Sequence, residues 1–228
     1  MYREWASVLP GAVVWRRTAA TESNTGRVLP DGCMDLIWWG GEILVAGPDT
    51  AAHLSTIGAG EALVGLRFAP GTGPAVLGVP ANELRDTRVP LGDLWPVRDV
   101  RLIEERTATD PVTALERLAA ARLAAAGGPE PLAGRIAAGL RTGMAVTELA
   151  DRLGLSARQL HRRCLPAFGY GAKTLARILR MQRALRRARA GGSLADVASL
   201  SGYADQAHFT REVRALAGAP PRELLAHS

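Results

Sequence analysis

The sequence predicts an α+β protein in which a mostly-β N-terminal part precedes an all-α C-terminal part. Three observations support this fold class. Short β-favouring runs separated by Gly and Pro fill residues 1–95. From about residue 93 onward, apolar residues recur with helical spacing instead. The charge changes as well, because residues 130–228 carry 16 Lys and Arg against 7 Asp and Glu, whereas residues 1–129 carry 12 against 15.

The N-terminal part contains three runs that predict β-strands: Cys33–Trp39, Glu42–Gly47 and Ala62–Phe68. Turn-forming stretches such as "LPDG", "AGP" and "APGTG" separate them. The stretch "GPAVLGV" that follows the last run predicts one short helix. Many short strands with frequent turns indicate a sandwich or a small barrel. All five Trp residues lie in this part, which we take as a sensor domain over residues 1–95.

Residues 96–128 are expected to form a helical connector. Its clearest stretch, "DPVTALERLAAARLAAAG", begins with Asp110 as a cap and Pro111 at the first helical position, and it ends at two glycines. Its apolar face carries Leu115, Leu118 and Leu123. This face is typical either of a dimer seam or of ordinary packing against the β domain.

The stretch "GGPEP" indicates a linker, and we place the boundary of the C-terminal domain, residues 129–228, there. Short helices are predicted after it, among them the very basic "AKTLARILRMQRALRRARAGG". The excess of positive charge in this domain is typical of a protein that binds a polyanion.

Two stretches of the C-terminal domain share one layout: "VTELADRLGLSARQLHRRC" and "LADVASLSGYADQAHFTREV". Each has a short helix, a Gly turn at Gly154 or Gly202, and a second helix that begins at a capping residue, Ser156 or Asp205. An apolar pair in each first helix is placed to pack on the second helix: Leu149 and Ala150 on Leu160, and Val197 and Ala198 on Phe209. This layout predicts a helix-turn-helix that occurs twice.

The second helix of each unit carries hydrogen-bonding side chains where a recognition helix exposes them to DNA. They are Arg158, His161 and Arg162 in the first unit, and Gln206, His208 and Arg211 in the second. Arg pairs with guanine and Gln with adenine through two hydrogen bonds, each worth about 1–3 kcal/mol of discrimination. A helix from Ala172 to Arg189 would be roughly 27 Å long, which suits two helices that enter successive major grooves roughly 34 Å apart. The predicted partner is double-stranded DNA.

The stretches "LADVASLSGYADQAHFTREVRALAGAPPREL" and "ELADRLGLSARQLHRRCLPAFGYGAKTLARILRMQRAL" resemble the DNA-binding domain of AraC/XylS transcription regulators over about residues 132–225. The resemblance implies seven helices, with two recognition helices held by one linker helix. It also implies a homodimer that pairs through a helix such as 110–126, and RNA polymerase as a partner. The base-facing positions that it implies are Arg158, His161, Arg162, Gln206, Ala207, His208 and Arg211.

The chain departs from the AraC/XylS pattern at three of its positions. Cys164 and Val213 stand where the family usually has an aromatic core residue, which questions how tightly the second helices pack. His208 stands where a smaller side chain is common. The N-terminal stretches "LPDGCMDLIWW" and "VGLRFAPGTGPAVLGVPANELRDTRVPLGDLW" resemble a cupin-like domain found ahead of such DNA-binding domains, with a sensing or dimerising role.

Charged and aromatic residues inside the predicted strands are candidates for an effector site. Asp35 and Arg67 lie in apolar strands, where they either pair in the interior or point to solvent by strand alternation. Trp38 and the other Trp residues line an apolar ligand pocket or form plain core. Cys33 is expected to be a small core residue rather than a redox or metal sensor.

Catalytic and metal chemistry find little support in the sequence. His161 and Cys164 are three residues apart on a helix, but no further ligands lie near them, and His53 is the only His of the β domain. We therefore expect no enzyme, no metal and no cofactor. A cupin-type enzyme tethered to DNA and an architectural protein that binds DNA without sequence preference remain alternatives.

The cellular context follows from what the sequence lacks. We see no apolar run as long as the roughly 18 residues of a membrane span, no secretory signal in "MYREWASVLP", and only two cysteines. The sequence thus predicts a cytoplasmic, sequence-specific DNA-binding transcription regulator with no membrane partner and a small-molecule effector bound in its N-terminal domain.

Overall fold

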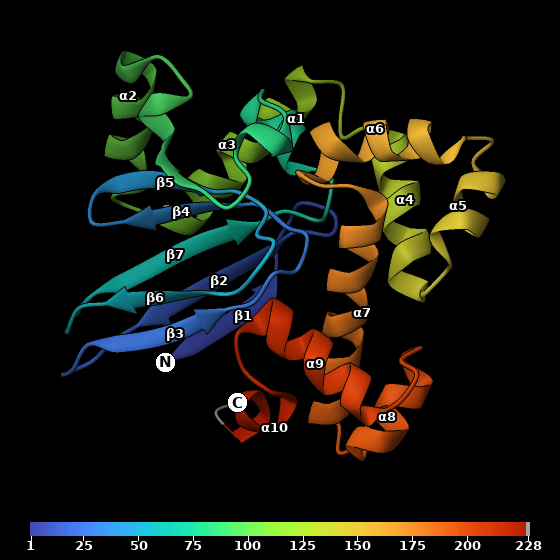
Figure 1. Ribbon diagram of the computed structural model, residues 1–228. Helices are drawn as coiled ribbons and strands as arrows, with labels where there is room; N and C mark the ends of the chain where they lie inside the picture. The colour runs from blue at the N-terminus through green and yellow to red at the C-terminus, as the bar shows by residue number, and fades with distance from the viewer. Residues whose placement is uncertain (227–228) are drawn as a thin grey trace.

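The computed structural model describes residues 1–226, so the last two residues of the predicted range 129–228 lie outside it. A strand-rich N-terminal part lies beside a helical C-terminal part, and helix α7 runs along the junction between them (Figure 1). The α+β fold class is confirmed.

The N-terminal part is built from two antiparallel sheets. The larger sheet has the strand order β1-β2-β7-β4-β5-β8, and β3 pairs only with β6. The strands are β1 Tyr2–Ala6, β2 Val13–Thr18, β3 Asn24–Val28, β4 Asp35–Trp39, β5 Glu42–Ala46, β6 His53–Ile57, β7 Ala62–Arg67 and β8 Arg88–Pro90. The described strands therefore form two separate sheets rather than one closed barrel, and the cupin-like assignment stays a prediction.

Three helices and two short 3-10 turns complete the N-terminal part. They are α1 Gly73–Leu77, α2 Val97–Thr107, α3 Pro111–Ala125, η1 Ala81–Glu83 and η2 Leu91–Asp93. The leucine face of α3 packs in the core of the β domain, with Leu115 only 1% exposed and Leu118 and Leu123 against the same core. Of our two interpretations of this face, packing against the β domain is therefore the one that the structure supports, and the homodimer stays a prediction.

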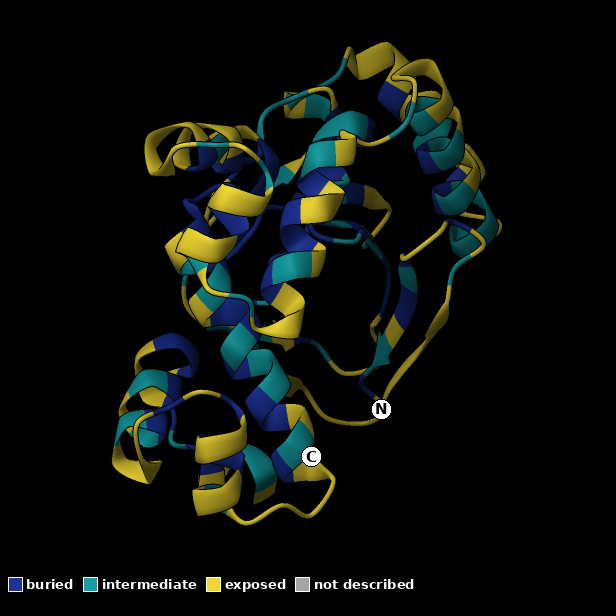
Figure 2. Ribbon diagram, turned by 90° about the vertical axis from the view of Figure 1, so that its right-hand side faces the viewer, coloured by how far each residue is buried: buried dark blue, intermediate teal, exposed yellow. Residues whose placement is uncertain are grey.

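The C-terminal part has seven helices among the described residues, as the resemblance implies. They are α4 Pro131–Thr142, α5 Val146–Arg152, α6 Ala157–Phe168, α7 Ala172–Arg189, α8 Leu194–Leu200, α9 Gln206–Ala217 and α10 Pro221–Ala226. Each helix buries the face that it turns to the core and exposes the opposite face (Figure 2). No helix within residues 1–226 is both long and apolar enough to span a membrane.

Both predicted helix-turn-helix units form, as α5–α6 and α8–α9. Gly154 and Gly202 take the left-handed conformation, with φ of +66° and +78°, at the turns where we expected them. The packing pairs are also confirmed, since Leu160 and Phe209 are 1% and 0% exposed against the first helix of their units. Cys164 and Val213 are fully buried, so these smaller residues leave the second helices well covered.

The N-terminal part contacts the three central helices of the C-terminal part, α6, α7 and α9. η1 packs against the end of α6. Gln182 of α7 donates a hydrogen bond to the Pro30 carbonyl at 2.8 Å. The Ala52 N–H donates to the Leu216 carbonyl of α9 at 2.7 Å. These contacts involve the second helix of each helix-turn-helix unit and the helix between them, so the N-terminal part packs directly against all three.

Candidate nucleic-acid interface and effector pocket

The first recognition helix, α6, begins with a complete capping box. The Gln159 N–H donates to Ser156 Oγ at 3.2 Å, and the Ser156 N–H donates to Gln159 Oε1 at 2.8 Å. Arg158 and Arg162 are exposed and lie one turn apart, on the side of the helix opposite Leu160. The two arginines therefore project outward from a rigid helix.

His161 of α6 lies at the edge of the outward face. A Cβ atom at Gly171 would overlap the His161 ring, so this ring rests on the backbone just before α7. It is nonetheless exposed. The predicted base contact of His161 is untested, and its position at the edge suits a contact with DNA backbone as well as one with a base.

The second recognition helix, α9, begins at Asp205, whose side chain accepts the His208 N–H at 2.6 Å. Ala207 and Arg211 are exposed on the face opposite the buried Phe209, and Gln206 is exposed at the first turn. All three side chains are therefore accessible to DNA, and their contacts with bases stay a prediction.

The His208 side chain is turned toward its own domain. Its Nδ1 accepts the Ala204 N–H at 3.3 Å, and its Nε2 lies 3.7 Å from Glu212. Its ring meets the edge of Tyr203 with centroids 5.4 Å apart. A contact between His208 and a base would have to compete with these three interactions.

Glu212 joins α9 to α7, which the sequence analysis missed. Its side chain is only 10% exposed and accepts two hydrogen bonds from Arg180, at 2.6 and 2.7 Å. Arg177 lies 3.6 Å away, and Arg180 also lies over the Tyr203 ring at 4.4 Å. This cluster fixes how α9 is rotated against α7. A Glu in an otherwise basic stretch was the one signal available in the sequence.

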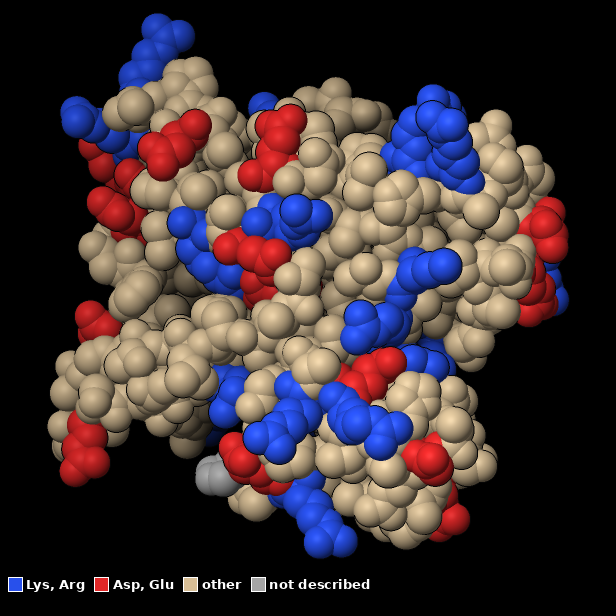
Figure 3. Space-filling view, in the orientation of Figure 1, with Lys and Arg blue, Asp and Glu red and all other residues tan. Residues whose placement is uncertain are grey.

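Several basic side chains lie on the visible face of α6, α7 and α9. Figure 3 shows Lys and Arg gathered over these three helices, with few acidic side chains between them. A surface of this kind attracts the phosphates of DNA and makes the affinity dependent on salt.

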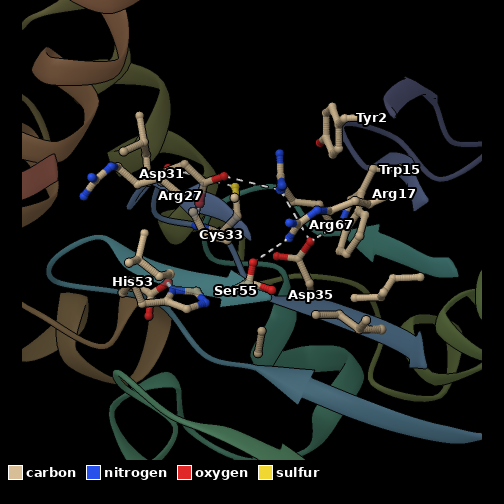
Figure 4. Close-up of a pocket in the computed structure, with 18 of the residues that line it drawn as sticks. Tyr2, Trp15, Arg17, Arg27, Asp31, Cys33, Asp35, His53, Ser55 and Arg67 are labelled. Carbon is tan, nitrogen blue, oxygen red and sulfur yellow. Dashed lines mark hydrogen bonds and ion pairs between the residues drawn. The ribbon is translucent and has the colours of Figure 1, made fainter. Parts of the chain in front are cut away.

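A cavity of about 770 Å³ lies between the two sheets of the N-terminal part (Figure 4). One end is apolar, with Trp15, Ile37, Trp39 and Leu63 packed in one cluster. Trp15 lies over Gly65, its partner across the strands, where any Cβ would overlap the indole ring. The helical domain closes the cavity in part, because Gln182 of α7 and residues of α10 line it.

Asp35 and Arg67 form an ion pair inside this cavity, as one of our two interpretations predicted. They are direct partners on β4 and β7, and Arg67 Nε lies 3.4 Å from Asp35 and 3.3 Å from Asp31. Asp35 also accepts a hydrogen bond from Trp15 Nε1 at 2.6 Å. Burial raises the pKa of Asp35 although Arg67 opposes it. Burial acts to lower the pKa of Arg67. The carboxylates of Asp35 and Asp31 act in the opposite direction, and the pKa is raised overall.

A second ion pair lines the end of the cavity toward the helices. Arg88 donates to both carboxylate oxygens of Asp49 at 2.5 Å, and His53 lies 3.4 Å from the same carboxylate. Burial and the neighbouring Arg88 lower the pKa of His53. The carboxylates at this end therefore already have cationic partners.

Two further arginines of the cavity, which the sequence analysis missed, donate hydrogen bonds to neutral oxygens, and Arg27 also lies 3.8 Å from Glu223. Arg17 of β2 donates to the Ser55 carbonyl at 3.0 Å and to the carbonyl and side-chain oxygens of Asn24, and burial lowers its pKa. Arg27 of β3 donates to the Ala217 carbonyl at 3.1 Å, at the end of α9. Arg17 thus holds β3–β6 to the large sheet, and Arg27 holds the same strands to the recognition helix.

Trp38 belongs to the core, one of our two interpretations, whereas Cys33 lies elsewhere than expected. Trp38 packs in the core on the opposite face of β4, because alternate residues of a strand point to opposite sides, so Trp38 does not line this cavity. Cys33 is half-buried at the cavity wall rather than in the core, and burial raises the pKa of its thiol. A thiol of this kind is a poor nucleophile.

The sequence matches two family models, one in each part. Residues 149–227 match a helix-turn-helix domain, and residues 12–90 match a domain of unknown function (DUF6597). No curated protein sequence matches the chain.

Two of the similar solved structures cover nearly the whole chain, and a third covers less than half of it. Apo ToxT K231A from Vibrio cholerae strain SCE256 has a TM-score of 0.50 at 10% identity, with 97% of this chain and 99% of that one covered. The unsaturated fatty acid bound wild-type ToxT of the same strain has a TM-score of 0.47 at 9% identity, with 98% and 93% covered. A probable AraC family transcriptional regulator from Rhodopseudomonas palustris CGA009 has a TM-score of 0.36 at 21% identity, with 41% and 94% covered.

The fold, the two capped recognition helices and the helix-turn-helix match define the class of this protein as a DNA-binding transcription regulator whose N-terminal part matches a domain of unknown function. Its C-terminal domain is of the AraC type, as the sequence predicted.

Proposed function

We propose that the protein selects DNA sequence with α6 and α9 and that an amphipathic anion bound in the N-terminal cavity controls this binding. The observation that carries the first half is the pair of capped helices at the two ends of one linker helix, each with exposed arginines. Arg158 and Arg162 of α6 and Arg211 of α9 are the proposed base-reading residues. His161, Gln206 and Ala207 complete the set, whereas His208, whose ring already contacts Ala204, Glu212 and Tyr203, supports α9 in this proposal rather than reading a base.

The second half rests on the lining of the cavity. Its apolar end suits a hydrocarbon chain or an aromatic ring. Asp35 and Asp49 already have arginine partners, whereas Arg17 donates to neutral oxygens, which makes it the natural partner of an incoming carboxylate. Arg27 lines the same cavity and contacts α9, so a ligand that draws Arg27 away would alter the support of a recognition helix.

The DNA half is tested by selection from a random duplex library, followed by titration of the selected duplex and a scrambled one at several salt concentrations. We expect the selected duplex to bind at least about 1000-fold more tightly, within the range of specific regulators. Equal affinities with equal salt slopes would favour the architectural alternative instead.

The effector half is tested by tryptophan emission, because all five Trp residues lie in residues 1–95 and two of them line the cavity. Long-chain unsaturated fatty acids and aromatic carboxylates are compared with the matching alcohols. We expect the acids to change the emission and the DNA affinity, and Arg17→Met to abolish their advantage over the alcohols. Arg16→Met is the matched control, because Arg16 is exposed and next to Arg17 on β2. Equal responses to acids and alcohols in the wild type would contradict an anion site.

Further features complete the proposal. A regulator of this class needs no catalytic step, and we propose that it acts in the cytoplasm through RNA polymerase at a promoter. A homodimer remains part of the proposal, but through a surface other than the leucine face of α3. Stoichiometric metal in the purified protein together with turnover would favour the enzyme alternative.

A further inference from the structure

We propose that Lys173 and Arg177 of the linker helix α7 form a third DNA contact, a phosphate-binding ridge between the two recognition helices. This inference rests on the proposed function, because it assumes that α6 and α9 lie in successive major grooves of one duplex. Lys173 and Arg177 are one turn apart, so their Cβ atoms are separated by about 5–6 Å and both reach the same stretch of backbone.

The contacts of α7 place these two residues between the recognition helices. His161 of α6 rests on the backbone of Gly171, two residues before Lys173. Glu212 of α9 lies 3.6 Å from Arg177. The side of α7 that carries the pair is thus flanked by α6 at one end and α9 at the other. Figure 3 shows basic side chains continuing over α7 between these two helices.

Three neighbouring arginines of α7 have structural partners. Arg180 holds Glu212, Arg183 donates to the Arg141 carbonyl at 3.1 Å, and Arg187 donates to Ser201 Oγ at 3.1 Å. Most of the remaining surface of α7 is buried in the core of the domain.

The ridge residues differ from these arginines. Lys173 is exposed and has no ion pair with any residue in the described part of the chain. The side chain of Arg177 is 47% exposed although it approaches Glu212, which Arg180 already neutralises. Both charges are therefore available to an outside anion at little cost in stability.

The groove geometry makes phosphate the fitting anion. When two recognition helices occupy major grooves about one repeat apart, the minor groove between them faces the helix that joins them. Its two edges carry phosphates, and duplex DNA presents one negative charge per about 1.7 Å of axis. Such contacts fix the register of a protein on the duplex and carry no sequence information. The ridge would therefore add affinity for every duplex, selected or scrambled.

The test compares a ridge double variant, Lys173→Ala with Arg177→Ala, with a matched control, Arg98→Ala with Arg101→Ala. The control removes the same charge from exposed positions of α2, where the Arg98 side chain is 88% exposed. Affinities for the selected and scrambled duplexes are measured from 50 to 300 mM salt by fluorescence anisotropy. A third variant, Lys173→Arg with Arg177→Lys, keeps both charges. Thermal unfolding is recorded for all of them.

We expect the ridge variant to lower the magnitude of the salt slope by about 1.8, at about 0.9 for each lost phosphate contact, for both duplexes alike. Its preference for the selected duplex should stay within twofold of the wild type, and the control and the charge-keeping variant should match the wild-type slope. An unchanged slope overturns the ridge, and so does a loss confined to the selected duplex. Equal wild-type affinities for the two duplexes would instead contradict the proposed function.

Discussion

The two helix-turn-helix units share a layout but differ in what holds their recognition helices. α6 has a full capping box and is held by buried apolar residues and by η1 of the N-terminal part. α9 has a single side-chain cap and is held by the ion cluster around Glu212, which joins it to α7. One unit is therefore positioned mainly by packing, the other by packing together with charge.

This difference indicates separate routes of control. The end of α9 receives hydrogen bonds from Arg27 and Ala52, which lie on or beside the β3–β6 pair that covers the cavity. The end of α6 lies against Pro48 and η1, and Arg85 reaches the Gly169 carbonyl only at 3.5 Å. A ligand in the cavity should therefore influence the second unit more strongly than the first.

The largest expected effect compares how much a buried core residue stabilises each of the two helix-turn-helix units. Phe209→Ala should lower the free energy of unfolding by about 3–5 kcal/mol and Leu160→Ala by about 2–5 kcal/mol, because each removes a buried side chain and leaves a cavity. Urea unfolding followed by circular dichroism measures both. A loss below 1 kcal/mol in one unit would show that its core collapses around the gap, and the comparison would then fail at the level of packing.

The next effect tests the charge cluster that distinguishes the second unit. Glu212→Gln should lower the free energy of unfolding by about 2–3 kcal/mol, because Arg180 is left partly buried without its counter-charge. The matched change in the first unit is Glu148→Gln, which breaks the exposed pair with Arg152 and should cost only about 0.3–0.5 kcal/mol. Similar losses in the two variants would contradict a special role of charge in α9.

Much of this architecture was predictable because it depends on local signals. Caps at Ser156 and Asp205, glycines at left-handed turns and apolar spacing define the helices through contacts within a few residues. Of the eight described strands, the sequence predicted β4, β5 and β7 and missed the others, among them β3 "NTGRV" and β6 "HLSTI", which carry polar residues. Their assignment depends on the partner strand and on the cavity that they cover.

The candidate sites were harder to predict for a related reason. The pairing of Asp35 with Arg67 was one of two interpretations, since strand alternation alone does not say which face of β4 meets a cavity. The same ambiguity left Trp38 open to two interpretations, the pocket and the core. Arg17, Arg27 and Glu212 act through partners 7 to 190 residues away in the chain, and no spacing rule within one helix or strand reveals such contacts.

A smaller effect tests the outward faces of the two helices. Arg158→Ala and Arg211→Ala should each weaken binding to the selected duplex by about 1–3 kcal/mol and relax the preference at one base pair. His208→Ala should leave base preference unchanged, because its ring already binds Ala204 and approaches Glu212. Selection from a random library with each variant measures this. A changed preference in His208→Ala would show that the side chain turns outward on DNA.

The smallest effect compares the two helix caps. Ser156→Ala should lower the free energy of unfolding by about 1 kcal/mol, because it leaves the Gln159 N–H without its acceptor and breaks the capping box. Asp205→Asn should change it by only a few tenths of a kcal/mol, since Asn accepts the His208 N–H nearly as well. Thermal unfolding with Ser199→Ala as an exposed control separates the two. If Asp205→Asn instead costs as much as Ser156→Ala, the negative charge at the start of α9 stabilises that helix beyond its hydrogen bond, and charge would then support the second unit at its beginning as well as through Glu212.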